Sequence, residues 1–157
     1  MSPVEQAPNP EQLTDAELAA WRGFLRVHAE LVKHLDAELD RAHALPLSSY
    51  EVLITLRDAG GRLRMAELAD RALLSRSGMT RLVDRLARDG LLERTQCDSD
   101  ARGCFASLTP KATELLAAAR PTHLAGVRER FLGRLDADEL RTLADLWDRL
   151  LPGASQT

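Results

Sequence analysis

Residues 75–109 read SRSGMTRLVDRLARDGLLERTQCDSDARGCFASLT, and this stretch decides the fold of the chain. Its apolar side chains recur at the spacing i, i+3, i+4 and i+7 of a helix with one buried face. They are Met79, Leu82, Val83 and Leu86. Ser75 suits a helix N-terminus, and Gly90 can adopt the left-handed conformation that ends a helix. We therefore expect a helix between these two residues, with that stripe in the core.

The opposite face of this helix is hydroxylic and basic. It carries Ser77, Thr80, Arg81, Asp84, Arg85 and Arg88. After Gly90, residues 91–95 and 104–109 have the pattern of two strands, joined by the charged, turn-rich segment 98–103. A basic helix followed at once by a hairpin with an arginine at its tip indicates recognition of duplex nucleic acid.

The charge of the chain is distributed unevenly. The net charge is −3, which at first sight argues against a polyanion as partner. Residues 61–107, however, hold 9 Lys and Arg against 7 Asp and Glu, whereas residues 1–60 hold 5 against 10. The middle segment is the only net-positive one. The sign of the charge on the contacting surface, more than the net charge of the chain, decides whether a polyanion can bind there.

A long helix is expected before this region. Thr14 is a suitable N-cap with acidic residues after it, and the apolar stripe continues to about residue 42. A single small domain could hardly cover such a length. We expect the surplus apolar face to meet a helix of a second subunit.

Between this helix and the basic one, the pattern predicts two shorter helices. Pro46 interrupts the chain, and Ser48 or Ser49 is expected to cap a helix over residues 50–59. Residues 66–73 form the next short helix, and a tight turn leads into the basic one. This order is the outline of a helix-turn-helix.

Residues 62–65 are a short extended piece that could pair with the hairpin as a third strand. After it, Pro110 suits the first position of a helix that extends to about residue 133, with a possible bend at Pro121. A last helix begins at Asp136.

The chain resembles the MarR-type winged-helix repressors, from about residue 13 to residue 150. The matching motifs are residues 74–86, residues 89–94, and the wing from Asp98 through Lys111. The resemblance implies a mainly α fold: a winged helix-turn-helix with a three-stranded β wing, and terminal helices that interlock in a homodimer.

The resemblance also divides the chain. Residues 46–109 would be the DNA-binding domain, and residues 13–45 and 110–151 the dimerisation helices. Residues 1–12 and 152–157 would be tails, the first of them disordered.

Each winged domain would read half of a palindromic operator in double-stranded DNA. Arg81 and Arg85 would lie in the major groove, where a guanidinium can bind both acceptors of guanine. Arg102 would enter the minor groove, oriented by Asp100, and Arg64 would contact phosphate. The expected DNA-binding set is Ser75, Arg76, Ser77, Thr80, Arg81, Arg85, Arg94 and Arg102. The alternative is a solvated basic face.

Members of the family are commonly released from DNA by small, often anionic or phenolic molecules. The candidates for such a cleft are Trp21, His28, Tyr50 and Arg57. Trp21 and His28 also lie on the apolar stripe, so plain packing is the alternative for both. A repressor relieved by a small-molecule effector is therefore the expected function.

Two cysteines raise another possibility. Cys97 and Cys104 lie on opposite arms of the hairpin, and a disulfide between them would reshape the wing. Known peroxide sensors of the family carry their cysteine in the first helix, where this chain has none. Free thiols in the strands are the simpler reading.

Other classes of protein have less support in the sequence. His28, His34, His43 and His123 lack metal-ligand spacing, and we find no phosphate loop or nucleophile elbow, so neither an enzyme nor a metal or other cofactor is expected. No apolar run approaches the length of a membrane span, and a cytoplasmic protein is expected. A helical dimer without DNA readout would leave the basic face unexplained.

Overall fold

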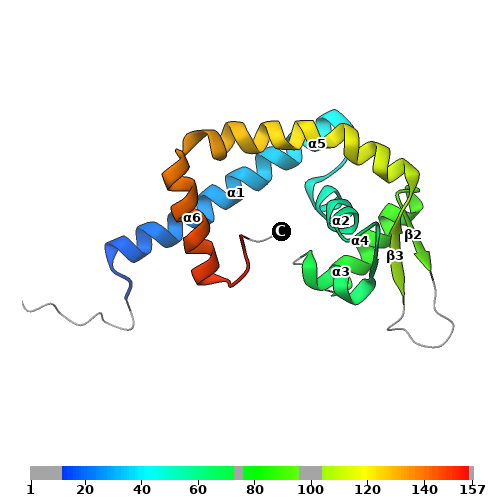
Figure 1. Ribbon diagram of the computed structural model, residues 1–157, viewed down its shortest axis with the longest axis horizontal. Coiled ribbons are helices and arrows are strands. Elements are labelled where there is room, and N and C mark those ends of the chain that lie inside the picture. Colours follow the sequence, from blue (N-terminus) through cyan, green and yellow to red (C-terminus); the bar gives the residue numbers. More distant parts are fainter. Residues whose placement is uncertain (1–11, 73–75, 96–103, 156–157) are drawn as a thin grey trace, which may run out of the picture.

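The computed structural model of the chain describes residues 12–72, 76–95 and 104–155. Its elements are α1 (Asp15–His43), α2 (Leu47–Asp58), β1 (Arg62–Arg64), α3 (Met65–Arg71), α4 (Arg76–Arg88), β2 (Leu92–Thr95), β3 (Phe105–Leu108), α5 (Pro110–Arg130), the 3-10 turn η2 (Leu132–Arg134) and α6 (Ala137–Leu150). Figure 1 shows a compact body made of α2, α3, α4 and the strands. The ends of α1 and α5 and the whole of α6 extend from it as an arm.

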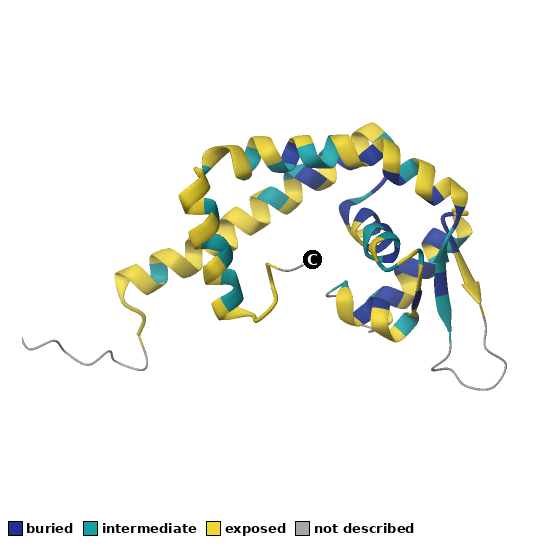
Figure 2. Ribbon diagram, viewed as in Figure 1, coloured by how far each residue is buried: buried dark blue, intermediate teal, exposed yellow. Residues whose placement is uncertain are grey.

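The body is built around one hydrophobic core. Met79, Leu82, Val83 and Leu86 of α4 are all buried in it, as the helical spacing predicts. Val52, Leu53 and Leu56 of α2 join them. Figure 2 shows that buried residues gather in the body, whereas most of α1 is exposed.

The predicted three-stranded wing is present. The strands lie in the order β1-β3-β2, and both pairings are antiparallel. Leu63 pairs with Ala106, and both side chains are buried on the inner face. The sheet is thus fixed to the body by one face, and its other face is open to solvent.

Local signals placed several helix ends correctly. Thr14 and Glu17 form a capping box at the start of α1, and Asp136 caps α6 through the N–H groups of Asp138 and Glu139. Gly90 has φ +74°, so it ends α4 as expected. Helix α5 runs continuously through Pro121 and follows a curved course in Figure 1.

The start of α2 differs from the prediction. The helix begins at Leu47, and neither Ser48 nor Ser49 caps it. Instead, the Oδ1 of Asp36 on α1 accepts a hydrogen bond from the Leu47 N–H at 2.8 Å. A carboxylate from another helix satisfies the exposed donor, so the serines are free to lie inside the first turn.

Two further helix ends differ from the prediction. Helix α5 stops at Arg130, where the turn η2 replaces the last predicted helical residues, and α3 begins one residue early, at Met65. In α3, the backbone N–H of Arg64 is bound by the Glu67 carboxylate at 3.4 Å. These differences leave the predicted order of elements unchanged.

Candidate nucleic-acid interface

Helix α4 presents the polar face that the sequence predicts. With its apolar stripe in the core, Ser77, Thr80 and Arg81 are exposed. Arg81 makes no ion pair or hydrogen bond with another residue of the described part of the chain. Its five N–H donors are therefore available to an acceptor outside the protein. Arg76 is the first residue of the same helix.

Arg85 has a partner that the sequence did not reveal. Its Nη2 donates to the Oγ of Ser49 on α2 at 3.0 Å, and Ser49 is only 1% exposed. The bond ties α4 to α2 and holds the guanidinium near the body. Arg81 is thus the less constrained of the two predicted guanine-binding arginines.

Arg94 connects the wing to α4. On β2, its guanidinium forms an ion pair with Asp84 of α4. This pair neutralises the one acidic residue on the basic face of α4 and fixes the wing relative to the helix. Lys111 adds a hydrogen bond from its Nζ to the Asp89 carbonyl oxygen at 2.7 Å, which supports the end of α4.

Several predicted residues cannot be placed. Ser75, Asp100, Arg102 and Cys97 lie outside the described residues. Cys104 is half-buried and directly precedes β3. The proposed roles of these residues therefore remain predictions.

A cleft of about 710 Å³ lies between the body and the arm. It is lined from α1, α2, α3 and α5, and its lining includes His28, Val32, Tyr50, Ile54, Arg71 and His123. Two of the predicted ligand residues, His28 and Tyr50, are thus brought together. Arg57 does not line this cleft, and its guanidinium binds Asp58. Trp21 lies at a separate pocket on the arm.

His123 is the cleft residue that the sequence reasoning missed. Its ring centroid lies 4.6 Å from that of Tyr50, and its Nδ1 is buried without a hydrogen-bond partner among the described residues. Burial lowers the pKa of His123 below 6.5, so the ring is neutral at pH 7. Burial raises the pKa of the Tyr50 hydroxyl, and the charge of Arg57 opposes that shift. No local motif marks His123, because its partner is distant in the sequence.

Other kinds of site are not found in the described part of the chain. It contains no cluster of His, Cys, Asp and Glu that could hold a metal ion. None of its helices combines the length and the apolarity that a membrane span requires.

Comparisons with known proteins agree with this geometry. A model of the MarR family matches residues 45–103. The structure of Sco3205, a MarR family transcriptional regulator from Streptomyces coelicolor in complex with DNA, is 34% identical with a TM-score of 0.84, covering 96% of this chain and 94% of that one. AbsC, a MarR family transcriptional regulator from the same organism, is 34% identical with a TM-score of 0.82, covering 88% and 94%.

Among curated proteins, the transcriptional repressor YetL of Bacillus subtilis is 28% identical over 123 residues, which are 76% of this chain and 74% of that protein. The fold and the relatives are those of transcriptional regulators. Since two relatives with over 30% identity match along nearly their whole length, this chain belongs to the MarR family and is a DNA-binding transcriptional regulator.

Proposed function

We propose that the protein is a homodimeric repressor that binds a palindromic operator in double-stranded DNA and is released by a small molecule. The observation that best supports DNA binding is the exposed position of Arg81 on α4. Arg81 is exposed on a helix whose opposite face is buried in the core, so the side of the helix that carries it is fixed and its donors remain available. Such an arrangement suits a guanine in the major groove.

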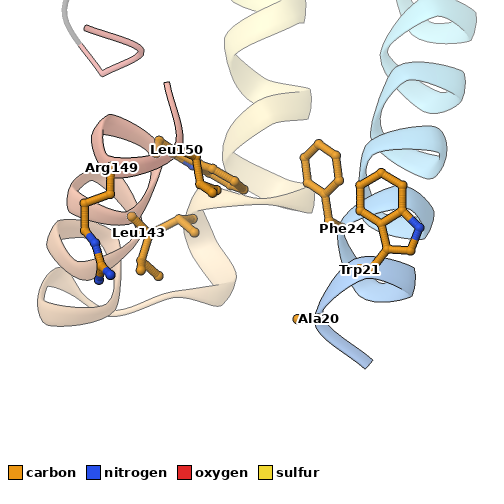
Figure 3. A pocket seen from close by; sticks show the side chains of 8 residues that line it. Ala20, Trp21, Phe24, Leu143, Arg149 and Leu150 are labelled. Carbon is orange, nitrogen blue, oxygen red and sulfur yellow. The ribbon is translucent and has the colours of Figure 1, made fainter. Parts of the chain in front are cut away.

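Exposed apolar side chains on the arm support the proposal of a homodimer. Trp21 is 54% exposed, Phe24 46% and Leu150 75%, which is unusual for such large apolar side chains. They line a pocket of about 570 Å³ between α1 and α6. In Figure 3, Phe24 lies on the side of α1 that is turned toward Leu143 and Leu150 of α6. A second copy of the arm would cover this apolar surface.

The large cleft supports control by an effector. It is lined by α1 and α5 of the arm and by α2 and α3 of the body, so a molecule bound there would contact both. Asp36 lines the same cleft and caps α2. An effector could therefore change the angle between arm and body, and with it the spacing of the two recognition helices.

The neutral His123 ring suggests what the effector offers. The buried Nδ1 has no hydrogen-bond partner in the described residues, whether it carries the proton and needs an acceptor or is unprotonated and needs a donor. A ligand with a hydroxyl group can satisfy either state. Tyr50 adds an aromatic face beside it. We expect a small aromatic hydroxyl compound to bind better than its methyl ether, because the hydroxyl group can satisfy either state of Nδ1, whereas the ether can only accept.

The repressor role is supported by the curated relative YetL, which is named a repressor. A repressor acts on chromosomal DNA, so the proposal places the protein in the cytoplasm. We propose residues 46–109, which span α2 to β3, as the DNA-binding unit, and residues 13–45 and 110–151 as the dimerisation helices.

A competition gel-shift assay on the region upstream of the protein's own gene tests the proposal. We expect a shift that survives excess random competitor, weakens with salt, and involves two subunits per duplex. Phenol and anisole form a matched pair of effector probes, and phenol should reduce the shift at lower concentration than anisole. Equal loss of the shift to specific and random competitor would contradict operator binding.

A further inference from the structure

Two arginines on β1 stack on one aromatic ring of the wing. Arg62 and Arg64 are two residues apart on a strand, so both side chains point to the same face of the sheet. Arg64 pairs with Phe105 on β3, and Arg62 pairs with Ser107. The guanidinium carbons lie 4.2 Å and 5.4 Å from the Phe105 ring centroid, within the range of a cation–π contact.

This cluster lacks a matching negative charge in the described residues. Glu93 is on the same face but belongs to β2, which lies beyond β3, and it makes no ion pair with either arginine. The Glu67 carboxylate binds the backbone N–H of Arg64. Two like charges that share one ring repel each other, and an anion between them would remove that repulsion.

The position of the cluster indicates which anion it would bind. The Met65 N–H donates to the Cys104 carbonyl oxygen at 2.9 Å, which joins the end of β1 to the start of β3. Arg64 therefore lies at the end of the sheet where the β2–β3 connection leaves it. The same end of β1 leads directly into α3 of the helix-turn-helix. DNA seated on α4 and the wing would pass its backbone close to this end.

We propose that Arg62 and Arg64, held in place by Phe105, form a binding site for a DNA backbone phosphate on the β1 edge of the wing, beside the start of α3. The inference rests on the proposed function, and it adds a contact that positions the wing without reading sequence. The aromatic ring orders both side chains before binding, so less rotamer freedom is lost when phosphate arrives. Arg94, by contrast, is already committed to Asp84.

The test is the salt dependence of DNA binding by the full chain. A fluorescent duplex of mixed sequence and about 30 base pairs, long enough for two half-sites one turn apart, is titrated with protein over a series of KCl concentrations. Each phosphate contact contributes about 0.9 to the slope of log affinity against log salt. Since the two arginines share one phosphate, we expect the double variant Arg62→Gln/Arg64→Gln to flatten this slope by about 0.9 per subunit, and each single variant by less.

Two controls separate a contact from other effects. Arg128→Gln removes one exposed positive charge from α5 on the arm and should leave the slope nearly unchanged. Phe105→Leu keeps both charges but removes the ring, so we expect weaker binding with a partly reduced slope. Thermal melting verifies that each variant is folded. If the double variant does not fold, the salt slopes of the two single variants serve as the test.

The outcomes are distinct. A slope equal to that of the wild type in the arginine variants, or an equal reduction in Arg128→Gln, would overturn the phosphate site. Failure of the wild-type protein to bind any duplex would instead overturn the proposed function itself.

Discussion

The body and the arm differ in how far they bury their apolar residues. In the body, Leu53 is completely buried by side chains of the same chain. In the arm, Leu25 is 44% exposed although it belongs to the same apolar stripe as the buried Leu39. The body closes its own core, whereas the arm leaves its apolar face exposed, as the proposed dimer requires. The following predictions test that difference, starting with the largest expected effect.

The first change places a charge on the arm. Phe24 contacts Trp21 and Trp147, with ring centroids 6.1 Å and 5.8 Å away. In Phe24→Asp, a symmetric dimer would bury two unpaired carboxylates, at a cost of about 3–5 kcal/mol each. We expect monomers by light scattering at micromolar concentration, with the body still folded by circular dichroism. A dimer as tight as the wild type would show that the interface lies elsewhere.

A matched pair of leucine truncations compares the two regions directly. Leu53→Ala should reduce the free energy of unfolding by about 2–5 kcal/mol at every protein concentration, because it opens a cavity in a closed core. Leu25→Ala should have an effect that grows with protein concentration, since its environment is completed only in the dimer. Denaturant titrations at two concentrations measure both. Concentration-independent losses in both variants would remove the distinction between body and arm.

The third change concerns the two arginines of α4. Arg81→Ala should cost about 1–3 kcal/mol of specific DNA binding and leave the melting temperature unchanged, because Arg81 has no partner in the described protein. Arg85→Ala removes the bond to Ser49 and should also lower the melting temperature. Fluorescence anisotropy and thermal melting separate the two cases. Unchanged operator preference in Arg81→Ala would mean that another face reads the bases.

The smallest effect concerns pH and the cleft between the regions. Because burial lowers the pKa of His123 in the folded state, the unfolded chain binds more protons below about pH 6.5. Stability from this residue is therefore present above that pH and is lost as the pH falls. His123→Phe keeps a ring beside Tyr50 and should reduce the loss by less than about 1 kcal/mol, since the site is partly exposed. Denaturation at pH 7 and pH 5 measures it, and identical pH dependence in both proteins would contradict a buried neutral ring.

Much of the fold could be predicted because its signals are local. The capping box at Thr14, the stripe from Met79 to Leu86 and the left-handed Gly90 each depend on residues within one or two turns. The three-stranded wing also followed from alternation and turn residues. The start of α2 was missed because Asp36, eleven positions before Leu47, supplies its cap.

The site was harder to predict than the fold. The polar face of α4 was evident from its period, but the bond between Arg85 and Ser49 joins residues 36 positions apart. The contact of His123 with Tyr50 depends on how α5 packs on α2. The alternation of Arg62 and Arg64 was visible, yet Phe105 became their partner only through the strand register. Tertiary contacts of this kind leave no periodic trace in the sequence.

The most direct test of the account is the mass of the protein–DNA complex, measured by light scattering during size exclusion with the upstream duplex of the protein's own gene. We predict two subunits on each duplex for the wild type, and a smaller fraction of duplex in complex at the same protein and salt concentrations for Arg81→Ala. A single subunit on the duplex, or a wild-type complex that forms equally well on random DNA, would contradict a dimer that reads its operator through α4.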